Sequence, residues 1–97
     1  MIYDFHPKAE KEFVASINYY EECQDGLGHE FAQEVNTAIL DIAECSKKWP
    51  IFYPGIRRRL INRFPYAILY SEEKEKIYII AVMLLSRDPN YWNSRLL

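Results

Sequence analysis

The sequence predicts an α+β protein in which one strand and two helices precede a sheet of mainly antiparallel strands. In the first half of the chain, apolar residues recur every three or four positions, the period of helices that bury one side. From Ile56 onward they fall in short runs rich in β-branched and aromatic residues, which favour strands. A helical hairpin lying across one face of a sheet satisfies both patterns.

The first elements are a short strand over Ile2–Phe5, which alternates apolar and polar residues, and a helix from Pro7 to about Cys23. Proline suits the first helical turn because its missing N–H would be unpaired there. The buried stripe of this helix is formed by Ala9, Phe13, Ile17 and Tyr20. The charged residues of this helix, including Glu12, are expected to face water.

A turn is predicted at residues 25–28, where two glycines can adopt positive φ at low cost. The second helix is expected to continue from there to Trp49. Its apolar stripe consists of Leu27, Phe31, Val35, Ala38, Ile39, Ile42, Cys45 and Trp49. This phase predicts that Cys45 is a buried free thiol. Because the turn is short, the two helices should form an antiparallel hairpin.

The remainder of the chain is expected to begin with a loop at residues 51–55, after Pro50 ends the second helix. Strands are predicted at residues 56–62, 66–70 and 77–84, with a charged hairpin loop at 71–76. They form a three-stranded, mainly antiparallel meander in one sheet, and the last strand is apolar enough to be central. A polar tail from Arg87 has room for one helical turn.

Length and composition predict a single domain over residues 1–97, because the chain has 97 residues, 49% of them hydrophobic and 27% charged. No apolar run approaches the roughly 20 residues needed to cross a bilayer, and the first residues do not resemble a signal peptide. Two cysteines are too few for a disulfide framework. These features predict a cytoplasmic protein with no membrane partner.

Charge is distributed unevenly along the chain. Residues 1–46 contain two basic and ten acidic residues, a net charge of −8, whereas residues 47–97 contain ten basic and four acidic residues, a net charge of +6. The overall charge of −2 argues against a general nucleic-acid binder. The basic second half nevertheless predicts a localised positive surface.

Neither a cofactor nor a metal site is predicted. Gly26-Leu27-Gly28 lies between two helices and not after a strand, so it does not match a dinucleotide-binding loop. His6 and His29 have no cysteine or histidine at ligand spacing. The acidic residues Glu30 and Glu34 are expected on a solvated helix face.

Three consecutive arginines occupy the strand predicted at residues 56–62. Because side chains alternate along a strand, Arg57 and Arg59 share one face and Arg58 points to the other. An arginine that faces the helix-covered core would need a carboxylate partner. Two interpretations stay open: protection of an edge strand, or a binding site in which Arg63 and Arg87 join Arg57 and Arg59 to bind phosphate or carboxylate.

Two large rings, Tyr91 and Trp92, stand in the polar tail. They are expected either to cap the core or to anchor a contact with another molecule.

Short motifs spread along nearly the whole chain resemble one known family. They are Ala9-Glu10, residues 17–21, Gly26-Leu27-Gly28 with Phe31 and Glu34-Val35, residues 57–60, residues 63–68, Ala81-Val82, Arg87-Asp88-Pro89 and Tyr91-Trp92. The more specific pair is Phe-Pro-Tyr-Ala at 64–67 and Arg-Asp-Pro-x-Tyr-Trp at 87–92. Together they resemble the RelE/ParE superfamily of toxins from bacterial type II toxin–antitoxin systems, in particular its ParE-like, plasmid-stabilisation branch.

The resemblance implies the same α+β fold and a toxin that a cognate antitoxin neutralises by wrapping it with a partly disordered, acidic-hydrophobic tail. ParE-like members are associated with poisoning DNA gyrase, whereas RelE-like members cut messenger RNA on the ribosome. Under the nuclease hypothesis, Arg57 and Arg59 occupy positions where RelE-like members have strand lysines. Arg87 and Tyr91 would supply part of the remaining catalytic residues. Ala67, however, occupies a position that is arginine in the nuclease branch.

Three hypotheses follow from this resemblance. The first is a gyrase-directed toxin without a catalytic cycle, which uses Arg57, Arg59, Arg63 and Arg87 as electrostatic contacts and Tyr91 and Trp92 as anchors. The second is a ribosome-dependent endonuclease with the catalytic set Arg57, Arg59, Arg87 and Tyr91. The third is a non-toxic relative that only binds an antitoxin, because Leu84 and Leu85 replace a histidine and a polar residue found in many ParE-like relatives.

Overall fold

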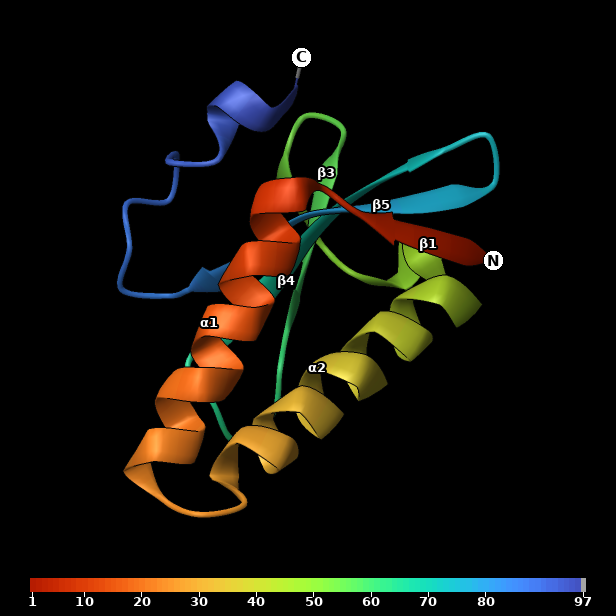
Figure 1. Ribbon diagram of the computed structural model, residues 1–97. Coiled ribbons are helices and arrows are strands. Elements are labelled where there is room, and N and C mark those ends of the chain that lie inside the picture. The colour runs from red at the N-terminus through yellow and green to blue at the C-terminus, as the bar shows by residue number, and fades with distance from the viewer. Residues whose placement is uncertain (97) are drawn as a thin grey trace.

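The computed structural model describes residues 1–96 and confirms the α+β class (Figure 1). Its elements are β1 (Ile2–Phe5), α1 (Pro7–Cys23), α2 (Leu27–Glu44), β2 (Ile51–Tyr53), β3 (Ile56–Leu60), β4 (Tyr66–Glu73) and β5 (Lys76–Leu84), with short 3-10 helices at Ser46–Lys48 and Asn93–Leu96. The first strand, the helical hairpin and the meander occur in the predicted order. β4 continues to Glu73, however, so residues 71–73 of the loop predicted at residues 71–76 are strand. No helix within residues 1–96 is long and apolar enough to cross a membrane.

The five strands form one sheet in the order β1-β5-β4-β3-β2. β3, β4 and β5 make the predicted antiparallel meander, and β1 joins β5 in parallel. The most apolar strand, β5, therefore lies inside the sheet, as its composition predicts. β2 pairs with the first residues of β3, Ile56 and Arg57, and Pro50 just before β2 accepts a hydrogen bond from the N–H of Arg58. The interpretation of residues 57–59 as an edge strand is therefore wrong.

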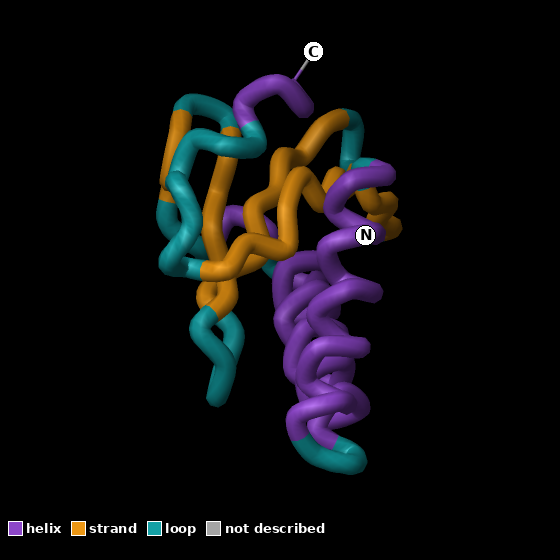
Figure 2. The backbone as a smooth tube through the Cα atoms, turned by 60° about the vertical axis from the view of Figure 1, so that its left-hand side comes forward, coloured by secondary structure: helices purple, strands orange, loops and turns teal. Residues whose placement is uncertain are grey.

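The sheet has a hydrophobic core on each face, because side chains alternate along its strands. α1 and α2 lie together on one side of the strands (Figure 2) and bury Phe31 and Val35 against Ile68 and Ile79. The other face is covered by residues 85–96, which we call the C-terminal segment, through the fully buried Trp92. The two faces thus have different covers.

The connection between α2 and β3 differs from the prediction. α2 ends at Glu44, and Cys45 follows it in a non-helical conformation (φ −147°) with an exposed thiol, so the predicted buried cysteine is wrong. Residues 51–53 form a strand and not a loop. This strand has only three residues and is flanked by Pro50 and Pro54, so it offers too short a pattern for periodicity to detect.

Gly28 allows the two helices to approach closely. It lies in the first turn of α2, where an added Cβ would be 2.5 Å from the carbonyl oxygen of Ile17 and 2.9 Å from Cβ of Glu21. The Glu21 carboxylate accepts hydrogen bonds from the backbone N–H groups of Gly26 (2.8 Å) and Gly28 (3.0 Å). It thereby satisfies donors that the start of a helix leaves unpaired.

Candidate binding site

Arg57 is bound to the backbone that connects α2 to β2. Its Nη1 donates to the carbonyl oxygens of Trp49 (2.6 Å) and Lys47 (3.3 Å). The neighbouring Tyr70, opposite Arg57 on β4, donates its hydroxyl to the carbonyl oxygen of Ser46 at 2.5 Å. Both side chains thus satisfy carbonyl groups just beyond the end of a helix, where such acceptors are in excess.

Arg59 is buried against α2. Its Nη2 lies 2.5 Å from a carboxylate oxygen of Asp41, and its guanidinium carbon lies 4.7 Å from the centre of the Trp49 ring. The prediction that an arginine facing the helices needs a carboxylate partner is therefore confirmed. Arg59 is buried although Asp41 is partly solvated, and removing Asp41 would leave the buried guanidinium without its carboxylate. Arg59 therefore supports the fold and does not present its side chain to a target.

Arg63 lies in the turn between β3 and β4, where it adopts a left-handed conformation with φ of 71°. Its side chain is 54% exposed and lies 2.6 Å from Glu30 and 4.0 Å from Glu34, both on α2. The two glutamates expected on a solvated face thus pair with an arginine at the sheet's end. An exposed pair of this kind contributes little to stability, so Arg63 remains available for contacts.

Four residues meet where side chains of the C-terminal segment contact α1, and we call them the Glu12 cluster: Glu12, Arg87, Tyr91 and Arg95. Arg95, only 7% exposed, donates two hydrogen bonds of 2.9 Å to the Glu12 carboxylate. Arg87 Nη1 lies 3.6 Å from the same carboxylate, and its side chain is 50% exposed. The guanidinium carbons of Arg87 and Arg95 lie 3.7 and 4.9 Å from the centre of the Tyr91 ring.

The Tyr91 hydroxyl is buried and has no hydrogen-bond partner within residues 1–96. Burial first, and then the adjacent Glu12 carboxylate, raise the pKa of the Tyr91 phenol above its ordinary value of 10.0. The same carboxylate, through its hydrogen bonds, raises the pKa of Arg95. Tyr91 is therefore a neutral phenol near pH 7 and a poor general base.

Trp92 is a core residue. It is fully buried, its Nε1 donates to the carbonyl oxygen of Pro89 at 2.6 Å, and the ring of Tyr53 meets it edge-on at 5.4 Å. Of the two roles expected for Trp92, the structure supports the core cap. An anchor for another molecule would need an accessible ring, which Trp92 does not have.

Comparison with known proteins identifies a matching family and a solved structure with the same fold. A family model described as the ParE toxin of the type II toxin–antitoxin system parDE matches residues 3–89. The chain belongs to the ParE toxin family. A solved structure described as the chromosomal ParDE TA system from P. aeruginosa has a TM-score of 0.75 and 16% sequence identity, covering 89% of this chain and 97% of that chain. At this identity the similarity shows the fold. The comparison with curated proteins finds no match.

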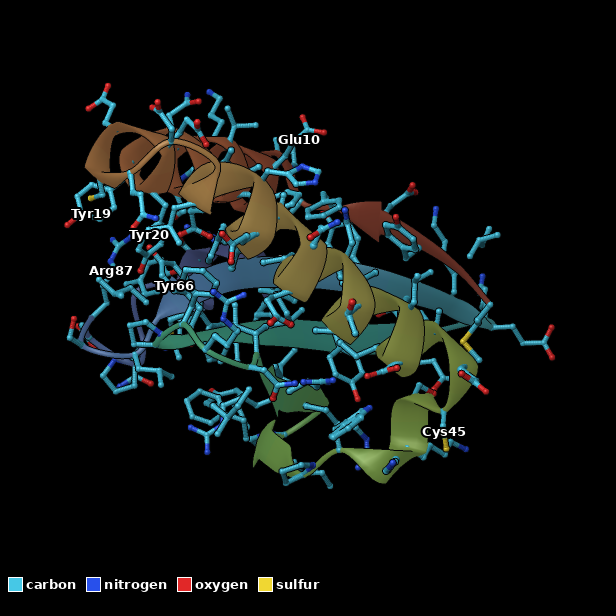
Figure 3. All side chains as sticks on the ribbon, turned by 90° about the horizontal axis from the view of Figure 1, so that it is seen from below. Glu10, Tyr19, Tyr20, Cys45, Tyr66 and Arg87 are labelled. Atoms are coloured by element: carbon cyan, nitrogen blue, oxygen red, sulfur yellow. The ribbon has the colours of Figure 1, made fainter. Side chains whose placement is uncertain are left out.

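The site residues predicted in this ParE-family chain do not form one patch. Arg57 and Arg59 lie against Trp49 beside the end of α2. Arg63 and Arg87 lie at one end of the sheet instead, because they flank the pairing of Tyr66 with Leu84. In Figure 3, Arg87 lies toward the same end of the molecule as Tyr20 and Tyr66, away from Cys45. The half-exposed arginines thus belong to this end.

Glu12 and Arg95 are not among the site residues predicted from the sequence. The expectation that Glu12 faces water is wrong, since its carboxylate is largely buried beneath the C-terminal segment. One signal for this existed: Glu12 follows the buried Ala9 by three positions, a spacing that places both on the same side of a helix.

Proposed function

We propose that this ParE-family toxin inhibits growth by binding and poisoning DNA gyrase, without a catalytic cycle of its own. This choice rests on one observation: the side chains that a nuclease would need are bound within the fold or buried. RNA cleavage requires a group that can accept a proton and cations that reach the scissile phosphate. Arg57 and Arg59 are bound within the fold, and the Tyr91 hydroxyl is neutral and buried.

The proposed contact surface consists of Arg63, Leu85 and Arg87, at the end of the sheet where Tyr66 pairs with Leu84. Leu85 is 43% exposed, and its N–H donates to the carbonyl oxygen of Pro65 at 2.9 Å, which ties it to the turn that carries Arg63. Two planar cations beside an exposed apolar side chain suit a protein partner that presents carboxylates, because arginine binds carboxylates in bidentate fashion.

We propose a cognate antitoxin as the second partner. The cytoplasm is the proposed location, because gyrase and a co-expressed antitoxin both act there. The basic second half of the chain is complementary to the acidic-hydrophobic tail expected of such an antitoxin. If the antitoxin tail covers the surface formed by Arg63, Leu85 and Arg87, it excludes gyrase by competition. Co-expression of the antitoxin should therefore restore growth.

The test is expression of the chain without antitoxin in a bacterial strain that carries a DNA-damage reporter. Growth arrest with a strong reporter signal is expected, and the charge reversal Arg87→Glu should weaken both effects. Arrest with a silent reporter and cut transcripts would contradict the proposal and favour the messenger-RNA endonuclease. Normal growth at confirmed high expression would favour a non-toxic relative that only binds antitoxin.

A further inference from the structure

β1 pairs with only the first half of one edge of β5. β1 pairs with β5 only as far as the Phe5–Ile79 pair, where the N–H of His6 makes the last hydrogen bond, 2.8 Å from the carbonyl oxygen of Ile79. β5 continues to Leu84. Backbone groups on this edge beyond Ile79 therefore need partners from outside the sheet.

Side chains of the Glu12 cluster provide those partners. The N–H of Val82 donates to Oε1 of Glu12 at 3.1 Å, and Nη1 of Arg95 donates to the carbonyl oxygen of Ile80 at 3.0 Å. Glu12 and Arg95 are also joined to each other by two hydrogen bonds. The ion pair thus continues the hydrogen bonding of the sheet where β1 has ended, and it fixes the Glu12 carboxylate on the sheet edge.

Arg87 lies beside this fixed carboxylate but makes no hydrogen bond to it. Glu12 carries one negative charge, whereas Arg87 and Arg95 carry two positive charges, so the cluster has one cation in excess. Arg95 takes the close hydrogen bonds, and the 3.6 Å separation of Arg87 from the carboxylate exceeds hydrogen-bond distance. The Arg87 guanidinium is stacked on Tyr91, and its N–H groups can donate hydrogen bonds to an acceptor on another molecule.

We propose that Glu12 is a positioning residue, which holds Arg87 on the Tyr91 ring in the orientation that binds a carboxylate of the target protein. This inference rests on the proposed function, in which Arg87 contacts gyrase. The physical basis is preorganisation: an arginine already held by a carboxylate and a ring loses less side-chain entropy when it binds. Glu12 acts through Arg87, without touching the target.

The test is a double-mutant cycle between Glu12 and Arg87, with affinity for purified gyrase and thermal stability measured on each variant. Glu12→Gln should weaken binding about tenfold in the natural background and less than about twofold when Arg87→Ala is present. The melting temperature should fall by the same amount in both backgrounds, because the Val82 and Arg95 contacts do not involve Arg87. Glu10→Gln, an exposed change in the same helix, is the matched control and should leave binding unchanged.

An equal loss of affinity in both backgrounds would overturn the inference, because it would mean that Glu12 only supports the fold. If Glu12→Gln does not fold, Glu12→Asp keeps the charge but withdraws the carboxylate, and its loss of affinity should also vanish with Arg87→Ala. If the unmodified chain does not bind gyrase, the proposed function fails instead. The ¹⁵N relaxation of Arg87 Nε then decides the inference: Glu12→Gln should increase its mobility, and unchanged mobility would overturn it.

Discussion

Replacing Trp92 with alanine removes the largest fully buried side chain, on the sheet face that the C-terminal segment covers. A buried tryptophan removes roughly 150–250 Å² from water, and at about 25 cal/mol/Å² this corresponds to roughly 4–6 kcal/mol. Measured tryptophan-to-alanine changes in cores cost about 3–5 kcal/mol. We expect a loss in this lower range, a large part of the roughly 5–15 kcal/mol that stabilises a small domain.

Thermal and urea unfolding measure this loss. For a chain of this length, about 1 kcal/mol lowers the melting temperature by roughly 5 °C, so Trp92→Ala should lower it by about 15–25 °C. Leu85→Ala is the control in the same segment, because Leu85 is partly exposed and its removal should cost about 0.5 kcal/mol or less. A melting temperature within a few degrees of the natural chain, together with lost gyrase binding, would refute the core assignment and restore the anchor role.

Three further outcomes are expected. Gly28→Ala should destabilise the helical hairpin by about 1–2 kcal/mol in urea unfolding, because the clash with α1 outweighs the better helix propensity of alanine; unchanged stability would contradict the close approach. Asp41→Ala should cost about 1–3 kcal/mol, since Arg59 is buried whereas Asp41 is partly solvated; a variant as stable as the natural chain would contradict the pair. The pKa values of Tyr20 and Tyr70 are each raised to about 12, chiefly by burial. The unfolded chain therefore binds fewer protons above pH 10, so the free energy of unfolding is highest below pH 10 and should fall as pH rises to about 12. A phenolate titration of the folded protein in which every tyrosine has its midpoint near pH 10 would contradict this shift.

Local patterns were sufficient to predict most of the fold. The stripe that begins at Ala9 and the proline at position 7 place α1, and the apolar run after Lys76 places β5, because helix and strand periods differ clearly. The end of α2 was not predictable in this way. Cys45 and Trp49 are in phase with the helix stripe, although α2 ends at Glu44, before both of them. Beyond this end, the backbone carbonyl of Trp49 accepts a hydrogen bond from Arg57, a contact between distant residues that helix periodicity does not reveal.

The site was less predictable than the fold, because its contacts join distant parts of the chain. Glu12 and Arg95 are 83 positions apart, and no spacing rule connects them. Arginines are recognisable as candidate contacts from sequence, but whether they are free depends on partners such as Asp41, which only the fold brings close. The sequence therefore could not distinguish Arg59 from Arg87. In the structure Arg59 is buried against Asp41, whereas Arg87 is half-exposed beside Glu12.

The most direct test of gyrase poisoning is a DNA-cleavage assay with purified gyrase, closed circular plasmid and the purified toxin. Linear DNA, covalently attached to gyrase, is expected to accumulate with the natural chain and to decrease with Arg87→Glu, while Glu10→Gln behaves like the natural chain. Intact circular DNA at toxin concentrations well above those that arrest growth, with normal supercoiling by gyrase, would contradict gyrase poisoning.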